Sequence, residues 1–486
     1  MLSKTSAHRW VIPFILFNAG HVLCRNLVPI RLSSGVGNGK RADLSGLDLL
    51  SAETFIWGDE DGSSLASLTV DMPGENENIV NMERFDGMLK SIECTADSVA
   101  LTFIDDATFA HAQQVWDWVN GADNHSFVSV AGAGDCGDNV DRKPFVVSSI
   151  AYDEEANKAT LSAEWDDWKT IAHSYDLVVG SIAESSEAAG KMRRDIDKTS
   201  TIDFNHDFPF SFTISANGLS ASLACTDCSS KGEFDMEFKI SQKLFIPTGA
   251  SMKIKPKGVS AIAQVKLSGS GSVTDALTKE FEIIKIPVSA LSIPGILDLG
   301  PFLTVSVGAE LLGISLTAGI TGGATAKLDD AAILEVDLLD PEKNTFSGWE
   351  PTVDTVDVKV DASISGGVAI FLKPSIELKA EALGTGFEIG LNLKAPNINA
   401  KLTAIASPQG ACTNPGDEKT TLGVNAGINI GAQLNIAATR SGDSDPLFTV
   451  QLAQLDTPLA AICFPFGDPV AKRSLTRMHS RQISGL

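Results

Sequence analysis

The feature that most constrains the fold of this chain is a strict alternation of apolar and polar residues between Val356 and Ala404. In Val356–Ile364 every second residue is apolar, and Asp, Lys, Asp and Ser stand between them. The same period of two returns after Pro374 and again from Phe387. Because successive side chains of a strand point to opposite faces, this period gives each strand one buried face and one wet face. Gly, Pro and Asn separate the segments, which is typical of an antiparallel meander.

Segments of the same pattern fill most of residues 204–468, which we predict to be one large antiparallel β module. They lie at Phe208–Ala216, Phe234–Ile240, Ser251–Lys255, Phe302–Leu311, Val424–Ile436 and Phe448–Leu455. About a dozen strands of this kind form either a β-sandwich or a barrel-like shell. The inward residues are often Ala, Gly or Val. We expect them to fill the interior, and the alternative is a shell with a lipid-sized cavity.

Residues 62–180 are predicted to form a separate, small α+β module. Strand-like segments surround one amphipathic helix, which follows the capping residues Asp105-Asp106. The apolar residues of this helix recur at helical spacing, at Phe109, Ala112, Trp116 and Val119. The predicted fold class is therefore mainly β, with this small module ahead of the large one.

The chain is predicted to have six parts. A signal peptide at 1–24 precedes a poorly structured segment at 25–61, and the small module at 62–180 follows. A polar and charged linker at 181–203 leads to the large module at 204–468, and a basic tail takes 469–486.

The first 24 residues have the order of a secretory signal peptide. Lys4 and Arg9 form a basic region, an apolar run from Trp10 to Phe17 follows, and small and apolar residues lead to Cys24. The run is too short for a bilayer span, which takes about 20 apolar residues. We expect a secreted protein that does not span a membrane, and a buried N-terminal helix is the alternative. Cleavage near Cys24 would change the net charge from −23 to −25, because two basic residues leave.

Loss of that segment leaves six of the seven cysteines, and an even number in a secreted chain favours disulfides. Pairing in sequence order predicts Cys94–Cys136, Cys225–Cys228 and Cys412–Cys463, although six cysteines allow many other connectivities. Cys225-Thr-Asp-Cys228 also has the spacing of a redox or metal pair. We favour a structural disulfide there, because the pair lies between strand-like segments and no second Cys or His pair completes a zinc site.

The acidic balance argues against one class of partner. With 38 basic residues against 61 acidic ones, the chain lacks the basic face by which nucleic-acid binders release counterions from phosphates. We therefore expect no nucleic-acid partner. Asn124-His125-Ser126 has the sequence of an N-glycosylation site in a polar, turn-like context, so we expect a glycoprotein.

No catalytic constellation stands out in the sequence. The histidines lack metal-ligand spacing, and the chain has neither a nucleophile elbow nor a glycine loop for phosphates. We expect no catalytic residue, no metal and no cofactor. Two acidic loops, Asp59–Gly62 and Asp135–Asp141, contain oxygen ligands of the kind that calcium prefers. Because neither has EF-hand spacing, we expect solvated loops.

Residues near the end of the small module carry the strongest indication of sugar chemistry. Asp166-Asp167 stands between Trp165 and Trp168, as carboxylates do in glycosidases. Adjacent strand residues point to opposite faces, so Asp166 and Asp167 are not expected to act together on one sugar as a glycosidase pair. Trp116, Trp118, Trp165 and Trp168 are instead candidates for a sugar-binding platform. Trp116 and Trp118 cannot both face the core from one helix, so one of them is expected to be partly exposed.

The order of these features resembles a family of uncharacterised secreted fungal proteins that have two modules. The first module is marked by Cys94, Leu101-Thr-Phe103, Ala110, Ala112, Trp116, Cys136 and Pro144–Val147. The second is marked by Cys225, Cys228, Gly232 and the turn Ser347-Gly-Trp-Glu-Pro351. The resemblance covers most of the chain. It implies a fungal, extracellular setting and carries no activity.

These observations lead to one expected function and two alternatives. We expect a secreted, non-enzymatic extracellular protein that is associated with the cell wall or surface or faces a host. The first alternative is a glycan- or lipid-binding module, whose partner would be a cell-wall glycan or a lipid. The second is a polysaccharide hydrolase that uses dispersed carboxylates.

Overall fold

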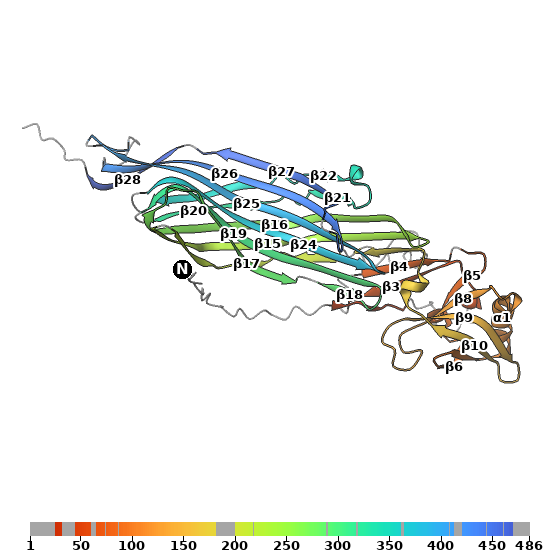
Figure 1. Cartoon of the computed structure of the whole chain (residues 1–486). Coiled ribbons are helices and arrows are strands. Elements are labelled where there is room, and N and C mark those ends of the chain that lie inside the picture. Colours follow the sequence, from red (N-terminus) through yellow and green to blue (C-terminus); the bar gives the residue numbers. More distant parts are fainter. Residues whose placement is uncertain are drawn as a thin grey trace, which may run out of the picture.

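The computed structural model describes most of the chain, and the described part is mainly β, as predicted (Figure 1). The described residues are 25–31, 44–59, 65–72, 74–85, 87–180, 200–216, 218–287, 290–316, 319–360, 364–407, 409–412, 420–443, 445–459 and 461–469. The predicted signal peptide at 1–24 lies outside them, as do residues 181–199 of the linker and 470–486 of the tail. Within the described ranges no helix is long and apolar enough to cross a membrane.

Within the described residues, the large module is one continuous sheet of 22 strands, mainly antiparallel, that folds into a sandwich of two layers, called sheet A and sheet B below. Gly271 and Ser272 of sheet B pair with Leu316 and Ser315 of sheet A and join the two layers. The long strands of sheet A are, in spatial order, β17 (Leu277–Pro287), β19 (Leu297–Leu316), β24 (Ile364–Ala382), β25 (Thr385–Ala406), β26 (Thr420–Arg440) and β27 (Phe448–Pro458). Shorter strands extend this sheet. β28 (Ile462–Pro469) pairs with the first part of β26, and β18 (Leu291–Ile293) lies between β19 and β1 (Arg25–Asn26).

Sheet B packs its apolar face against that of sheet A. Its strands are, in spatial order, β2 (Val28–Pro29), β3 (Ala52–Gly58), β4 (Leu65–Asp71), β11 (Tyr175–Val179), β15 (Leu219–Lys243), β16 (Ile246–Ser272), β20 (Gly319–Lys327) and β23 (Thr352–Val360). Further along β15 lie β12 (Ser200–Asp203), β13 (His206–Asp207) and β14 (Ser211–Ala216), and β21 (Ile333–Asp337) joins β16 to β22 (Thr345–Ser347). Both sheets contribute to one buried core, for example through Leu267 and Val305.

The predicted alternation is confirmed in sheet A. Ile376, Leu378 and Ala380 of β24 are buried, and Lys379 and Glu381 beside them are exposed. The strands are nevertheless longer than the sequence indicated, and β16 reaches 27 residues.

Two prolines that were predicted to separate strands lie inside them instead. Pro374 is in β24 and Pro396 is in β25, and the pairing register of these strands shifts at both places. A bulge leaves a residue without a ladder partner, so it tolerates a proline, which has no N–H to donate.

Side chains fill the space between the two sheets in the middle of the sandwich. Val265 and Ile320 of sheet B and Ile370 and Ile428 of sheet A surround a cavity of about 20 Å³. Such a volume has room for about one water molecule. No acyl chain fits there.

The turn between β15 and β16 has an unusual sequence for its geometry. It has two central residues, Leu244 and Phe245, with φ of 49° and 63°. Positive φ at both positions is the pattern of a type I′ hairpin turn, which favours Asn-Gly. Leu244, Phe245 and Ile246 are also 57%, 59% and 66% exposed. The hairpin tip therefore combines backbone strain with exposed apolar surface.

Replacing this tip by the preferred turn residues is expected to stabilise the protein. The double variant Leu244→Asn/Phe245→Gly should raise the free energy of unfolding by about 1–2 kcal/mol, because it removes left-handed strain at two residues. Denaturant unfolding measures this change. Leu244→Ala/Phe245→Ala is the control, because it removes the apolar side chains and keeps the strain. Equal stabilisation by both variants would show that strain is not the cause.

The small module is inserted into the sandwich. Its sheet has the order β5 (Glu77–Asn81), β8 (Ser126–Ala131), β9 (Lys143–Asp153), β10 (Lys158–Trp165), β7 (Ser98–Phe103) and β6 (Leu89–Cys94). Helix α1 (Asp106–Trp116) begins after Asp105, whose carboxylate accepts a hydrogen bond from the Thr108 N–H at 2.8 Å. The chain leaves sheet B after β4 and returns in β11, and these two strands pair with each other. The module lies at one end of the elongated sandwich (Figure 1).

These pairings correct several predicted boundaries. β3 falls in the segment 25–61 that was predicted to be poorly structured, and β4 and β11 fall in the predicted small module, yet all three belong to sheet B. β12 falls in the predicted linker 181–203. Their assignment depends on hydrogen bonds to distant strands, chiefly to β15, which local periodicity cannot identify.

One buried arginine joins the inserted module to the sandwich. Arg142 precedes β9, and its guanidinium is bidentate to Glu83 of η2 (Met82–Phe85), at 3.0 and 2.9 Å. It also donates to the carbonyl oxygens of Ile56 and Ile30 on the sandwich side, at 2.8 and 2.9 Å, and lies over the Trp57 ring. The side chains of Arg142 and Glu83 are only 1% and 4% exposed. The joint is therefore a desolvated ion pair with most of its donors used.

Candidate functional site

A groove at the edge of the sandwich is the strongest candidate site. It has a volume of about 600 Å³, within the range of ligand sites. Edge strands of both sheets form it, β22 and β23 from sheet B and β27 from sheet A. Its lining residues are Lys327, Leu328, Asp329, Phe346, Ser347, Gly348, Trp349, Glu350, Thr352 and Leu452.

The sequence Ser347-Gly-Trp-Glu-Pro351 shapes one wall of this groove. Gly348 has a φ of 73°, and a Cβ there would lie 3.0 Å from the Ala332 Cα, so this turn requires glycine. After it the Trp349 side chain enters the core and is 2% exposed. Ser347 and Glu350 stay exposed on either side. The turn therefore buries its aromatic residue and presents its polar ones.

Partly exposed apolar side chains form the floor of the groove. Phe346, Leu328 and Leu452 pack against the main core and keep part of their surface exposed. Close by, a small separate cluster of Ala326, Ala395 and Ala432 packs sheet B against sheet A. The floor is thus supported by packed strands of both sheets.

The rim of the groove is polar and predominantly acidic. Asp329 and Glu350 are exposed, and the Asp329 carboxylate accepts a hydrogen bond from the Ala331 N–H at 2.9 Å. Lys327 lies 3.8 Å from Asp354 of β23. The Thr352 hydroxyl donates to the Lys327 carbonyl at 3.4 Å. Hydrogen-bond donors and acceptors, including positively and negatively charged side chains, therefore surround an apolar floor.

The buried indole N–H of Trp349 has no hydrogen-bond partner among the described residues. A buried donor without an acceptor destabilises a folded chain by about 1–3 kcal/mol. Five other buried polar side-chain atoms of the described residues also lack a partner, among them Ser129 Oγ and Thr304 Oγ1, so this feature alone does not mark the groove.

The predicted tryptophan platform is wrong. Trp116 is buried in the core of the small module and donates to the Leu47 carbonyl at 2.7 Å, whereas Trp168 is buried in the sandwich core. Trp165 is 51% exposed, and Trp118, which is partly exposed as predicted, stacks on His125. Trp116 and Trp168 are thus buried in two different cores, and the four tryptophan rings do not form one surface.

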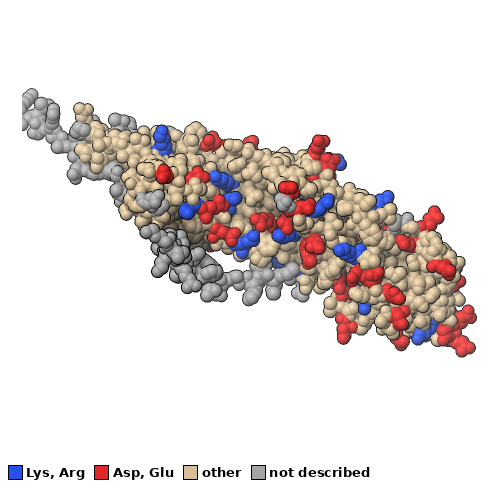
Figure 2. Space-filling model, viewed as in Figure 1, with Lys and Arg blue, Asp and Glu red and all other residues tan. Residues whose placement is uncertain are grey.

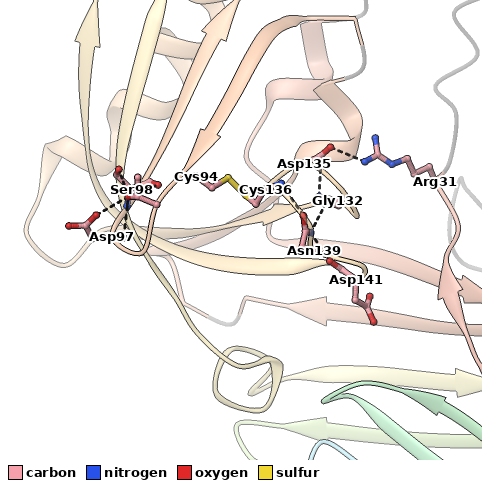
Figure 3. The surroundings of a disulfide bond; sticks show 10 residues. Arg31, Cys94, Asp97, Ser98, Gly132, Asp135, Cys136, Asn139 and Asp141 are labelled. Carbon is pink, nitrogen blue, oxygen red and sulfur yellow. Dashed lines mark hydrogen bonds and ion pairs between the residues drawn. A yellow bond between two sulfur atoms is a disulfide. The ribbon is translucent and has the colours of Figure 1, made fainter.

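The three predicted disulfides are confirmed. Cys94–Cys136 links β6 to the loop after β8, and Cys412–Cys463 links the segment after β25 to β28 (Figure 3 for the first). Cys225–Cys228 closes a register shift within β15, so this pair does not open a helix as a redox pair normally does.

The acidic loop Asp135–Asp141 is organised by its own hydrogen bonds (Figure 3). The Asp135 carboxylate accepts from the Gly132 N–H and from Arg31, each at 2.8 Å, and Asn139 donates to the carbonyls of Gly132 and Asp141. Among the residues that the structure describes, no group of three or more His, Cys, Asp and Glu side chains could hold a metal. In the other predicted loop, Asp59–Gly62, only Asp59 is described.

The remaining sequence candidates lie on the surface. Asp166 accepts a hydrogen bond from the Asp167 N–H at 2.7 Å, and Asp167 precedes the short helix α2 (Trp168–Ile171). Asn124 is exposed in the turn between η3 (Asp117–Gly121) and β8. Neither position belongs to the groove.

Sequence reasoning missed the groove because its two walls lie about 100 residues apart along the chain, at Phe346 and Leu452. One signal was present in the sequence. Trp349 is the single tryptophan of residues 204–468, and it stands in a turn with glycine and proline.

Two family models match the chain. One, described as a domain of unknown function (DUF7223), matches residues 201–465, and the other, a domain of unknown function (DUF7029), matches residues 72–176. No similar curated protein and no similar solved structure was found. The second match starts directly after β4 and ends in β11, so it coincides with the inserted module, and the first match contains every groove residue.

Proposed function

The chain belongs to the family of the domain of unknown function DUF7223, and we propose that it is a secreted, non-enzymatic extracellular protein that acts by binding. Its place would be the cell wall, the cell surface or the contact with a host. The observation that carries this proposal is the pairing of the six described cysteines in three disulfides. Disulfides form and persist in oxidising compartments, chiefly outside the cytosol.

Further features support an extracellular setting. Residues 1–24 have the order of a signal peptide, and the chain resembles secreted fungal proteins. Asn124 is an exposed asparagine in a glycosylation sequence, so we propose that it carries a glycan. Figure 2 shows Lys and Arg interspersed with Asp and Glu along the sandwich, a surface suited to water.

The edge groove supports binding as the mode of action. It combines an apolar floor with a polar rim, which is the usual composition of a ligand site. The candidate ligands are a glycan and a lipid.

Secretion of residues 1–486 from a eukaryotic host tests the compartment. We expect the protein in the medium, with an N-terminus near Cys24 and no cysteine that reacts with an alkylating reagent before reduction. Glycosidase treatment should lower its mass, and Asn124→Gln should abolish that shift. Retention in the cell, or reactive cysteines in the secreted protein, would contradict the proposal.

Incubation of the purified protein with a panel of polysaccharides tests the non-enzymatic part. We expect no new reducing ends. Release of reducing ends that Asp166→Asn or Asp167→Asn abolishes would establish a hydrolase with dispersed carboxylates instead.

A further inference from the structure

We propose that the edge groove binds a neutral or amino-sugar saccharide chain, and this inference rests on the proposed binding function. Sugar rings would lie against Phe346 and Leu452, and their hydroxyl or amino groups would meet the acidic rim at Asp329 and Glu350. The ligand class follows from the shape, the polarity and the charge of the groove.

The composition of the groove matches the two surfaces of a sugar. A sugar ring presents C–H groups on its faces and hydroxyl groups around its edge. Phe346 offers a partly exposed aromatic ring beside the aliphatic Leu328 and Leu452. Ser347 and Thr352 carry hydroxyl groups at the rim, and carboxylates accept hydrogen bonds from ligand hydroxyls.

The interior of the sandwich argues against a lipid. An acyl chain needs a long apolar channel, because its gain comes from removing methylene groups from water. The cavity between Val265, Ile320 and Ile370 measures about 20 Å³. The groove itself is rimmed by charged groups, including Lys327 and Glu350. A ligand that is polar along its edge therefore fits better than an acyl chain.

The charge at the rim argues against an acidic polysaccharide. Among the lining residues, Asp329 and Glu350 stand against one cation, Lys327, whose charge is paired with Asp354, and the whole chain has a net charge of −23. Uronate or sulfate groups would be repelled, most strongly at low ionic strength. Neutral sugars avoid this repulsion, and the ammonium group of a deacetylated amino sugar is attracted.

Titration calorimetry with three hexasaccharides of different chemistry tests the inference. The probes are a chito-oligosaccharide, a neutral β-glucan oligosaccharide and an oligogalacturonate. We expect the full-length protein to bind the first or the second, and to bind the acidic probe at least about tenfold more weakly. Absence of binding to all three, or preference for the acidic one, would overturn the inference.

Matched variants locate the site. Phe346→Ala should weaken binding about tenfold through loss of the aromatic surface, whereas Phe212→Ala should not, because Phe212 is a similarly half-buried ring that stacks on Phe281 away from the groove. Asp329→Asn/Glu350→Gln should weaken it by about the same factor. Asp330→Asn/Glu342→Gln, which changes exposed acids outside the groove lining, should have no effect. Equal effects of test and control variants would place the site elsewhere and overturn the inference.

The outcomes separate this inference from the proposed function. If none of the saccharides binds while the secreted protein is fully disulfide-bonded, the saccharide assignment fails and the extracellular assignment stands. Binding of phosphatidylcholine vesicles that Phe346→Ala weakens, without saccharide binding, would assign the groove to a lipid and overturn the inference. Reactive cysteines would contradict the extracellular function irrespective of ligand.

Discussion

Replacement of Arg142 by methionine is expected to lower the free energy of unfolding by about 3–5 kcal/mol, although Arg142 does not line the candidate groove. Methionine fills much of the volume and carries no charge. It would leave the Glu83 carboxylate buried without a partner, and the carbonyls of Ile56 and Ile30 would each lose a hydrogen bond. Denaturant unfolding followed by tryptophan fluorescence measures the loss, because Trp57 lies directly against the guanidinium.

Two further variants test the cause of that loss. Lys379→Met is the control, because Lys379 pairs with Glu388 at 2.9 Å and both side chains are exposed, so the loss should be at most about 1 kcal/mol. Arg142→Met/Glu83→Leu should recover most of the stability, since it removes the unpaired charge. If the double variant is as unstable as Arg142→Met, the buried charge is not the reason.

Replacement of Trp349 by alanine is expected to lower the free energy of unfolding by about 3–5 kcal/mol. The indole is among the largest fully buried side chains of the chain, and its removal opens a cavity under the groove. Thermal and denaturant unfolding both measure the effect. Binding of the groove ligand should weaken in parallel, because the wall that Trp349 supports would relax.

Trp349→Phe separates packing from hydrogen bonding at this position. Phenylalanine keeps an aromatic ring in the core and removes the N–H that has no partner among the described residues. The smaller ring fills less of the core, which destabilises the fold, and removal of the unpartnered N–H stabilises it. Because these effects offset each other, we expect the free energy of unfolding to change by about 1 kcal/mol or less. A loss as large as that of Trp349→Ala would show that the N–H is bonded in solution.

Much of the fold could be predicted from the sequence because the sandwich is built from local alternation. The period of two identified the buried residues of β24 and β25, such as Ile376 and Leu391, without knowledge of their partners. Strand ends were less predictable, because Pro374 and Pro396 lie at bulges that periodicity cannot distinguish from turns. The insertion of the small module was missed because the pairing of β4 with β11 is a contact between segments about 100 residues apart.

The candidate site could be predicted far less well. Cysteine order was sufficient for the disulfides, since each bond joins neighbours in that order. The sugar-binding platform was predicted from tryptophans that are close in sequence, yet Trp116 and Trp168 fill two different cores. A groove between β22 and β27 depends on how two sheets meet, which a single sequence does not encode locally.

Binding in the edge groove is tested most directly by hydrogen–deuterium exchange of the full-length protein with and without a saturating hexasaccharide. We expect slower exchange in peptides that cover 345–352 and 449–455, and unchanged exchange in the inserted module at 77–165. Protection confined to the inserted module, or no protection in the presence of measured binding, would contradict a ligand site at the edge of the sandwich.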